Sequence, residues 1–323
     1  MLDAYWIGID GGGTKTSAVI GDSNGQLLAV YYGQSGNLTA ISIEQLVERI
    51  HHIIEHLLVK SNIELSSVNL IFAALAGADR QGEQQKIYEA FQHSPILKKL
   101  RVQSDVHAAL ASGTWSREGT LMIAGTGAIL FGWHQNKSFR IGGWGYLLGD
   151  EGSGYHLGKL AIRSILQAQD QNVALRPFQK AILDFIKVKH PEELITTIYS
   201  SSNPVTVISS VSKIVINAYE EDDVAKTIIS TVLEALLALV KSGYERMDIM
   251  KPLVLHGGLF SDESFYRDFV QIISSNYPKL IVKKPNVIGA VGAYILALLE
   301  SDVFLDDERK QNIQRTWSQL EIK

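Results

Sequence analysis

The chain has 323 residues, of which 46% are hydrophobic and 20% charged, and a formal net charge of −4. This length exceeds what one hydrophobic core usually serves, so we expect two domains. The slightly negative charge gives no electrostatic reason to expect a nucleic-acid or membrane partner. The absence of cysteine excludes disulfides, thiol catalysis and cysteine-held zinc or iron–sulfur clusters, and it is consistent with a cytoplasmic location.

A glycine-rich loop follows the first predicted strand, which covers the β-branched and aromatic run of residues 5–9. Consecutive glycines carry no side chains, so their backbone N–H groups can approach a phosphate closely. Asp10 stands at the mouth of this loop, where a carboxylate can hold Mg²⁺, usually through water. The loop offers backbone amides, two hydroxyls and one ammonium group to phosphate oxygens. Its residues are Gly11, Gly12, Gly13, Thr14, Lys15 and Thr16.

The residues around and after this loop distinguish among phosphate-binding designs. A Walker A loop needs adjacent glycine and lysine before a helix, whereas Thr14 separates Gly13 from Lys15. A dinucleotide fingerprint needs a third glycine where this chain has Thr16. An Asn-Gly turn at residues 24–25 separates two strand-like runs, so the loop closes a β-hairpin. We predict a hairpin phosphate loop, with a plain glycine turn as the alternative.

The rest of the first half alternates strands and helices. Residues 43–58 show the apolar periodicity of an amphipathic helix. Two further strands and two further helices are predicted, in alternation, at residues 68–74, 83–92, 100–103 and 105–112. The resulting order β-β-β-α-β-α-β-α predicts a mixed sheet with helices packed against it.

From residue 119 the chain repeats the layout of its beginning. A strand at residues 120–124 leads into a tight loop formed by Gly125, Thr126 and Gly127. Two further predicted strands, residues 128–133 and 139–141, complete a strand–loop–hairpin arrangement like that of residues 5–32. Few identities support a duplication, but the shared layout does.

This repeat sets the predicted domain organisation of an α/β protein. We place an N-terminal domain at residues 1–115 and expect a charged C-terminal helix, within residues 303–323, to fold back on it. A second domain then covers residues 116–302 and contains a run of helices at residues 175–250.

A glycine-rich segment, residues 142–154, follows the repeated hairpin. It carries Asp150 and Glu151, and the glycines around them leave both carboxylates accessible rather than buried in a helix. A polyol substrate needs such acceptors, because its hydroxyl groups are paired donors and acceptors. Asn37, in the loop after the first hairpin, would add a polar contact. Taken singly, Asn37 and Glu151 are more simply interpreted as surface or turn residues.

The ends of two more predicted strands carry candidate roles. The predicted strand at residues 252–256 ends in Gly257 and Gly258, where a flat base and ribose could lie on the backbone; a plain βα turn is the alternative. Asp105 ends one strand and begins a helix. It is either a helix N-cap or a general base that accepts the proton of a substrate hydroxyl during phosphoryl transfer.

Together these motifs resemble those of the sugar-kinase, Hsp70 and actin superfamily. Within it, the chain resembles the N-acetylglucosamine kinase and BadF/BadG/BcrA/BcrD-type ATPase family. Residues 8–16 look like the first phosphate motif, residues 124–127 like the second and residues 255–259 like the adenosine motif. Residues 142–154 are the most specific match, because they are similar to the corresponding segment of amino-sugar kinases.

The resemblance implies two ribonuclease-H-like (actin-like ATPase) domains, with mixed sheets flanked by helices, that close over sugar and MgATP in a cleft between them. Asp105 would be the catalytic base, and Asp10 would hold magnesium. The sugar would contact Asn37, Asp105, Gly143 and Asp150. The nucleotide would contact Gly12, Gly13, Thr14, Lys15, Gly125, Thr126, Gly127, Gly257 and Gly258.

The resemblance also implies a partner, and the absence of cysteine argues against two branches of the superfamily. Members of this family often dimerise, so a homodimer is expected. The 2-hydroxyacyl-CoA dehydratase activators hold an iron–sulfur cluster with cysteines, and ROK-type glucokinases hold zinc with cysteines. This chain has no cysteine, so the activator function is close to excluded, and the ROK-type branch is disfavoured.

The function expected from the resemblance is ATP-dependent phosphorylation of the 6-hydroxyl of an amino sugar, with N-acetylglucosamine as the first choice. N-acetylmuramic acid or free glucosamine is the alternative substrate. A nucleotide-dependent sugar sensor that closes without transferring phosphate is an alternative of another class. The presence of both Asp10 and Asp105 argues against a pure sensor, which needs no base.

Overall fold

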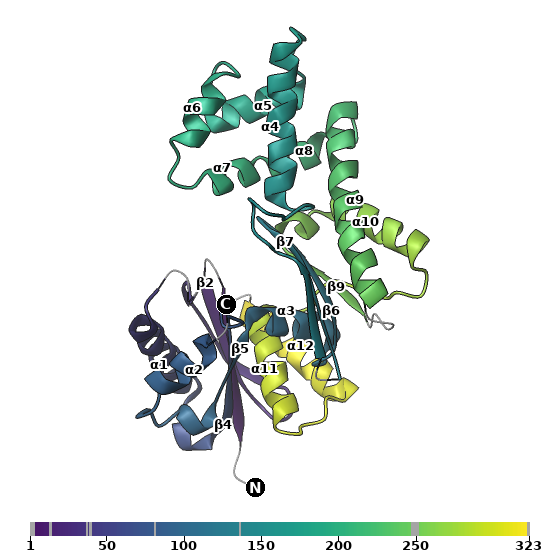
Figure 1. Ribbon diagram of the computed structural model, residues 1–323. Coiled ribbons are helices and arrows are strands. Elements are labelled where there is room, and N and C mark those ends of the chain that lie inside the picture. Colours follow the sequence, from purple (N-terminus) through teal and green to yellow (C-terminus); the bar gives the residue numbers. More distant parts are fainter. Residues whose placement is uncertain are drawn as a thin grey trace. The chain divides into compact units, whose positions relative to one another are not determined.

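A computed structural model describes residues 4–12, 15–36, 38, 41–80, 82–135, 137–246 and 252–321. The chain forms two compact units (Figure 1). The first unit combines Met1–Gly119 with Lys283–Lys323, and the second covers Thr120–Val282. No helix among the described residues has the length and apolar character needed to cross a membrane.

The first unit is built on a five-stranded mixed sheet with the order β3-β2-β1-β4-β5. Strand β1 is antiparallel to β2 and parallel to β4, and β5 is parallel to β4. The strands are β1 (Tyr5–Gly11), β2 (Lys15–Asp22), β3 (Leu27–Gln34), β4 (Val68–Leu75) and β5 (Leu100–Ser104). Because β1, β4 and β5 are parallel, their carboxyl ends lie at one edge of the sheet.

Helices cover both faces of this sheet. One apolar core joins the sheet to α1 (Ile43–Ser61) and α2 (Glu83–Ala90), and the core on the opposite face joins it to α3, α11 and α12. The remaining elements are α3 (Asp105–Thr114), α11 (Gly289–Glu300), α12 (Asp307–Glu321) and the 3₁₀ turns Leu65–Ser67 and Leu97–Lys99.

The second unit repeats this sheet. Its strand order is β8-β7-β6-β9-β10, which matches the order of the first sheet when each unit is counted from its own first strand. Strand β6 is parallel to β9, and β7 is antiparallel to β8. The strands are β6 (Gly119–Ala124), β7 (Ala128–His134), β8 (Lys137–Gly142), β9 (Leu253–His256) and β10 (Val282–Lys283). The predicted fold class and its repeated layout are thus confirmed.

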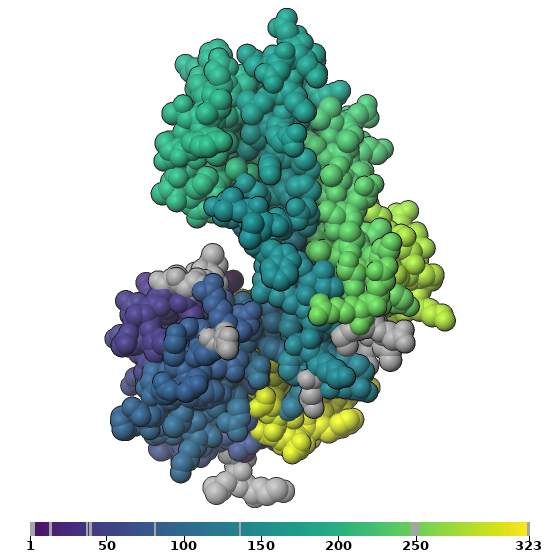
Figure 2. Space-filling view, viewed as in Figure 1, coloured from purple at the N-terminus to yellow at the C-terminus, as the bar shows by residue number. Residues whose placement is uncertain are grey.

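A long helical segment separates β8 from β9, as the sequence predicts. Its helices and the sheet share one apolar core, and Figure 2 shows the helices, from teal to green, as a continuous packed body. The helices of the unit are α4 (Gly154–Asp170), α5 (Pro177–Ile186), α6 (Glu193–Tyr199), α7 (Pro204–Ser210), α8 (Ser212–Ala218), α9 (Asp223–Arg246) and α10 (Glu263–Asn276). A 3₁₀ turn, Gly258–Ser261, follows β9.

The placement of α11 differs from the predicted division of the chain. The sequence assigns residues 283–302 to the second domain, whereas α11 packs on β1, β4 and α3 of the first unit. Nine consecutive residues of α11, Ala290–Leu298, are buried, and a helix that is apolar on every side needs packing partners all around it. Gly8 and Gly292 allow the close approach, because a Cβ at either position would overlap backbone atoms of the facing element.

The substitution Gly8→Ala tests this packing. The added Cβ would overlap the Tyr294 amide nitrogen and the Ala290 carbonyl oxygen of α11. Backbone atoms cannot rotate away as a side chain can, so we expect the free energy of unfolding to fall by more than about 3 kcal/mol. Urea denaturation measures the change, and a Gly8→Ala protein with the wild-type midpoint would contradict the observed packing of α11.

Candidate functional site

The first glycine-rich loop joins β1 to β2. The two strands pair in antiparallel register up to Gly11 and Thr16, and the Gly12 N–H donates a 3.1 Å hydrogen bond to the Lys15 carbonyl. Thr16 is only 3% exposed, and its hydroxyl has no hydrogen-bond partner among the described residues. The proposed contact between the Thr16 hydroxyl and phosphate stays a prediction. The loop residues Gly13 and Thr14, and the candidate sugar ligand Asn37, lie outside the described residues.

Three carboxylates gather at the carboxyl edge of the first sheet. Asp10 lies near the end of β1, Asp79 follows β4, and Asp105 follows β5 directly. Burial, together with the negative charge of Asp105, raises the pKa of Asp10 to about 7, although the Lys15 charge acts in the opposite direction. Burial also raises the pKa of Asp105, with a smaller contribution from Asp79. This site therefore favours a proton or a cation.

Asp105 lies at the start of α3 but not at its N-cap position. Ser104, not Asp105, occupies the N-cap position of α3. The Ser104 hydroxyl donates a 3.2 Å hydrogen bond to Asp105 Oδ1, which stabilises the ionised carboxylate and lowers its pKa against the effect of burial. Asp105 thus remains half-buried, with a raised pKa, at the start of a helix. Such a carboxylate can accept a proton from a ligand hydroxyl.

Sequence reasoning assigned no role to two further residues of this cluster, Asp79 and His107. Burial lowers the pKa of His107 to about 4, although the nearby Asp79 charge raises it. His107 is therefore neutral at pH 7. One feature of the sequence could have indicated a role for Asp79: it lies just beyond the predicted strand 68–74, at the same edge of the sheet as Asp10.

The donor set of this cluster bears on magnesium binding. Among the residues that the structure describes, no group of three or more His, Asp or Glu side chains can hold a metal ion. Mg²⁺ is commonly held by one or two carboxylates together with water and phosphate oxygens. Asp10, with its raised pKa and the neighbouring Asp105 charge, fits that mode. Its carboxylate lies against Gly289, where a Cβ would overlap Asp10 Oδ2.

In the second unit, a pocket of about 360 Å³ brings together loops that are distant in the sequence. Gly125 and Thr126 come from the β6–β7 turn and Gly258 from the turn after β9. A Cβ at Gly125 or Gly258 would meet nothing within 4 Å, so a ligand could approach the backbone there. The pocket is lined by Gly125, Thr126, Gly154, Ser209, Ser212, Gly258 and Leu259.

The packing of the protein itself explains why glycine stands at positions 257 and 127. Gly257 has φ 104°, and its Cβ would lie 2.5 Å from the Ala124 carbonyl oxygen, so only glycine fits there. A Cβ at Gly127 would lie 2.9 Å from Asp150 Oδ2. The Asp150 carboxylate is therefore packed directly against the β6–β7 turn.

Ser209 and Ser212 were missed because the sequence of the helical segment looks generic. They lie at the junction of α7 and α8, and the fold alone brings them to the pocket. If a nucleotide occupies the pocket, Ser212→Ala should raise the KM for ATP roughly three- to tenfold, the value of one hydrogen bond, and leave the sugar KM unchanged. Ser210→Ala is the control, because Ser210 is exposed and its hydroxyl bonds to the Val207 carbonyl. Equal KM values in both variants would remove Ser212 from the site.

The glycine-rich segment after β8 presents Asp150. Gly143 adopts φ 67° and donates a 2.8 Å hydrogen bond to the Ala128 carbonyl. Asp150 itself adopts φ 64°, and its Oδ1 is buried without a hydrogen-bond partner in the described parts of the chain. Burial raises its pKa, and backbone N–H groups of Ala128 and Gly145 lower it. A buried acceptor of this kind is satisfied when a ligand supplies a donor. Glu151 is exposed.

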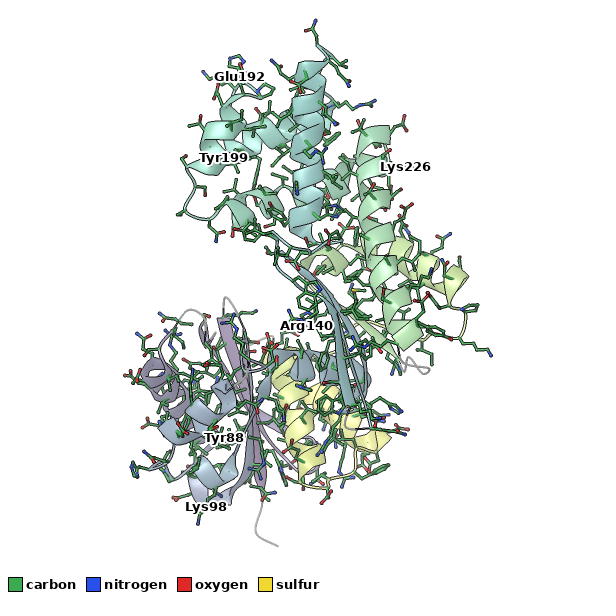
Figure 3. All side chains as sticks on the ribbon, in the orientation of Figure 1. Tyr88, Lys98, Arg140, Glu192, Tyr199 and Lys226 are labelled. Atoms are coloured by element: carbon green, nitrogen blue, oxygen red, sulfur yellow. The ribbon has the colours of Figure 1, made fainter. Side chains whose placement is uncertain are left out.

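Arg140 of β8 supports the same segment (Figure 3). Its guanidinium donates to the Gly143 carbonyl and lies 5.7 Å from the centre of the Trp144 ring. Trp144 is 66% exposed. A cation over an aromatic face is a favourable contact, so Arg140 helps to hold the start of the segment.

One protein family and two known proteins match most of this chain in sequence. The BadF/BadG/BcrA/BcrD ATPase family matches residues 7–297. A Clostridium acetobutylicum protein described as N-acetylmuramic acid/N-acetylglucosamine kinase is 34% identical over 304 residues, which cover 92% of this chain and 99% of the relative. A Dictyostelium discoideum N-acetyl-D-glucosamine kinase is 29% identical over 320 residues, with the same coverage of both chains.

Solved structures share the fold. One described as a putative N-acetylglucosamine kinase from Chromobacterium violaceum superposes with a TM-score of 0.73 at 24% identity and covers 91% of this chain and 99% of its own. A second, from Porphyromonas gingivalis and described in the same way, has a TM-score of 0.68 at 18% identity and covers 93% and 99%. These two likenesses support the fold alone.

Proposed function

This chain belongs to the BadF/BadG/BcrA/BcrD ATPase family, and we propose that it is an ATP-dependent kinase that phosphorylates the 6-hydroxyl of an amino sugar. N-acetylglucosamine is the first choice, because both relatives that align with most of the chain are named for it. The Clostridium relative is also named for N-acetylmuramic acid, and a glucosamine kinase from Vibrio cholerae is 30% identical over 171 residues, 51% of this chain and 56% of that protein. These two sugars are the alternative substrates.

The observation that carries this proposal is the carboxylate cluster at the edge of the first sheet. Asp105 is proposed as the general base: it would accept the proton of the sugar hydroxyl as the hydroxyl oxygen attacks the γ-phosphorus of ATP. The bond from that phosphorus to the β,γ-bridging oxygen would break, and ADP would leave. The support is the position of Asp105 at the start of α3, with a pKa raised by burial.

Magnesium is proposed as the cofactor, with Asp10 as its protein ligand. Bound Mg²⁺ would neutralise negative charge on the phosphate oxygens. The phosphates would lie on the amides of the two glycine loops, with Lys15 as a nearby cation. Burial and the charge of Asp105 make Asp10 a carboxylate that favours a cation, which supports this role.

The sugar is proposed to bind through Asn37, Gly143, Asp105 and Asp150. The buried Asp150 Oδ1, without a partner among the described side chains and backbone groups, supports this assignment, because a sugar hydroxyl is a donor of the required kind. We further propose that the protein acts in the cytoplasm as a homodimer. The absence of cysteine is consistent with the location.

A substrate analogue tests whether the 6-hydroxyl is the acceptor. N-acetylglucosamine should stimulate ADP release from MgATP, and its 6-deoxy analogue should bind without stimulating ADP release beyond slow hydrolysis. The analogue keeps every other hydroxyl, so it separates binding from transfer. Equal ADP release with both sugars would show an ATPase that responds to sugar, and not a kinase acting at this position.

A further inference from the structure

His156 lies outside every role assigned so far, yet it is hydrogen-bonded to the turn that carries Asp150. It is the third residue of α4, and its Nδ1 accepts a 3.1 Å hydrogen bond from the Gly152 N–H. Its own backbone N–H donates a 3.0 Å bond to the hydroxyl of Ser153, the N-cap residue. The pair resembles a capping box, in which the third helical residue is usually Glu or Gln and reaches back to the N-cap N–H.

The turn that His156 holds is conformationally demanding. Asp150 adopts φ 64° and Gly152 φ 89°, and the Ser153 N–H donates a 3.1 Å bond to the Asp150 carbonyl. A non-glycine residue with positive φ is unfavourable unless its surroundings fix it. The His156–Gly152 bond is one such constraint, and it lies two residues from the carboxylate.

The same helix start also holds the β6–β7 turn, which lines the pocket of the second unit. The N–H of Gly154 donates a 2.7 Å bond to the Gly125 carbonyl, and the N–H of Tyr155 donates a 3.2 Å bond to the Thr126 carbonyl. The first turn of α4 thus connects the Asp150 turn with the β6–β7 turn, and His156 completes the connection on the Asp150 side.

From these contacts we infer that His156 is a positioning residue, which in its neutral form fixes the Asp150 turn for sugar binding. The inference rests on the proposed role of Asp150. The bond requires an unprotonated Nδ1, because a protonated imidazole has two donors and no acceptor. Protonation of His156 would therefore release the Gly152 N–H and loosen the turn.

The burial of His156, more than the charges around it, sets the direction of this pH dependence. Burial lowers the pKa of His156, Glu151 raises it, and Lys159 lowers it. Helix α9 contributes an apolar contact at Gly152 through Leu236. The neutral form is therefore favoured in the folded protein, and its bond is lost only when the pH falls below the ordinary histidine value of about 6.5.

Three variants test the inference by their sugar KM across pH. His156→Phe keeps an aromatic ring but removes the acceptor, so its sugar KM should rise roughly fivefold at pH 8, with kcat changed less. His156→Asn places an amide oxygen near the position of Nδ1 and does not titrate. At pH 8 this variant should have the wild-type sugar KM. Below about pH 6.5 the sugar KM of the wild type should rise as His156 is protonated, and the sugar KM of His156→Asn should rise less. His190→Asn, at an exposed histidine, should behave as the wild type.

An activity-independent readout separates this inference from the proposed function. Trp144 lies in the same segment as Asp150 and is largely exposed, so its fluorescence, taken as the difference from a Trp144→Phe protein, reports the order of the segment. On acidification it should change in the wild type and stay constant in His156→Asn. If no sugar is phosphorylated but this difference appears, the proposed function fails and the positioning role stands. If wild type and His156→Asn share the same fluorescence and KM profiles, the inference is wrong.

Discussion

The substitution Asp105→Asn is expected to lower kcat by roughly 10³-fold, which lies in the range of rate enhancement that a positioned general base provides. An amide has nearly the size of the carboxylate and can still accept the hydrogen bond from the Ser104 hydroxyl, but it cannot take up a proton. The KM values for ATP and sugar should change only a fewfold, because Asn retains hydrogen-bonding groups for the sugar. Steady-state ADP release and ATP binding by calorimetry separate the two quantities.

A matched control guards against a general effect of Asp-to-Asn exchange. Asp170 is exposed at the end of α4, and Asp170→Asn should leave kcat unchanged. If Asp105→Asn retains turnover within about threefold of the wild type, another group must be the base. Asp79, which raises the pKa of Asp105 by its charge, would be the next carboxylate to test.

The substitution Gly289→Ala is expected to lower kcat/KM for MgATP by roughly 10²-fold, the cost of a displacement of about 1 Å at a reacting centre. The added Cβ would overlap Asp10 Oδ2, so the carboxylate must move. Gly289 is the first residue of α11, where alanine is a better helix former than glycine, so the helix itself should not be weakened. Activity as a function of magnesium concentration should show a higher magnesium requirement.

A double-mutant cycle with Asp10→Ala identifies the cause. Alanine at position 10 removes the atoms that the new Cβ would meet, so Gly289→Ala should add less than about a twofold change in that background. The same loss in both backgrounds would show that the Gly289→Ala substitution disturbs the packing of α11 rather than the position of the Asp10 carboxylate.

The strands and their repeated order could be predicted from the sequence because short, local patterns encode them. β-Branched and aromatic runs separated by glycine or Asn-Gly turns predicted β1, β2, β3 and the corresponding strands of the second unit, and the structure has the same strand order twice. Asp10 lies near the end of β1 and Asp105 directly follows β5, so both lie at the carboxyl edge of the first sheet. Their separation along the chain did not matter, because the carboxyl ends of parallel strands meet at one edge.

The parts that could not be predicted depend on contacts between distant segments. The packing of α11 on β1 brings Tyr294 against Gly8, and no local sequence pattern predicts that contact. Ser212 belongs to a helical segment whose periodicity describes burial but not which pocket it lines. His156 was likewise hidden, since its role depends on the direction of one ring nitrogen toward Gly152.

The most direct test of the account is Mg²⁺-dependent ADP production from ATP with a panel of sugars at equal concentration: N-acetylglucosamine, N-acetylmuramic acid, glucosamine, N-acetylmannosamine and glucose. We expect one or two amino sugars, N-acetylglucosamine among them, to give kcat/KM values far above those of the others. A flat panel, with only slow ATP hydrolysis that no sugar stimulates, would contradict the assignment of this protein as an amino-sugar kinase.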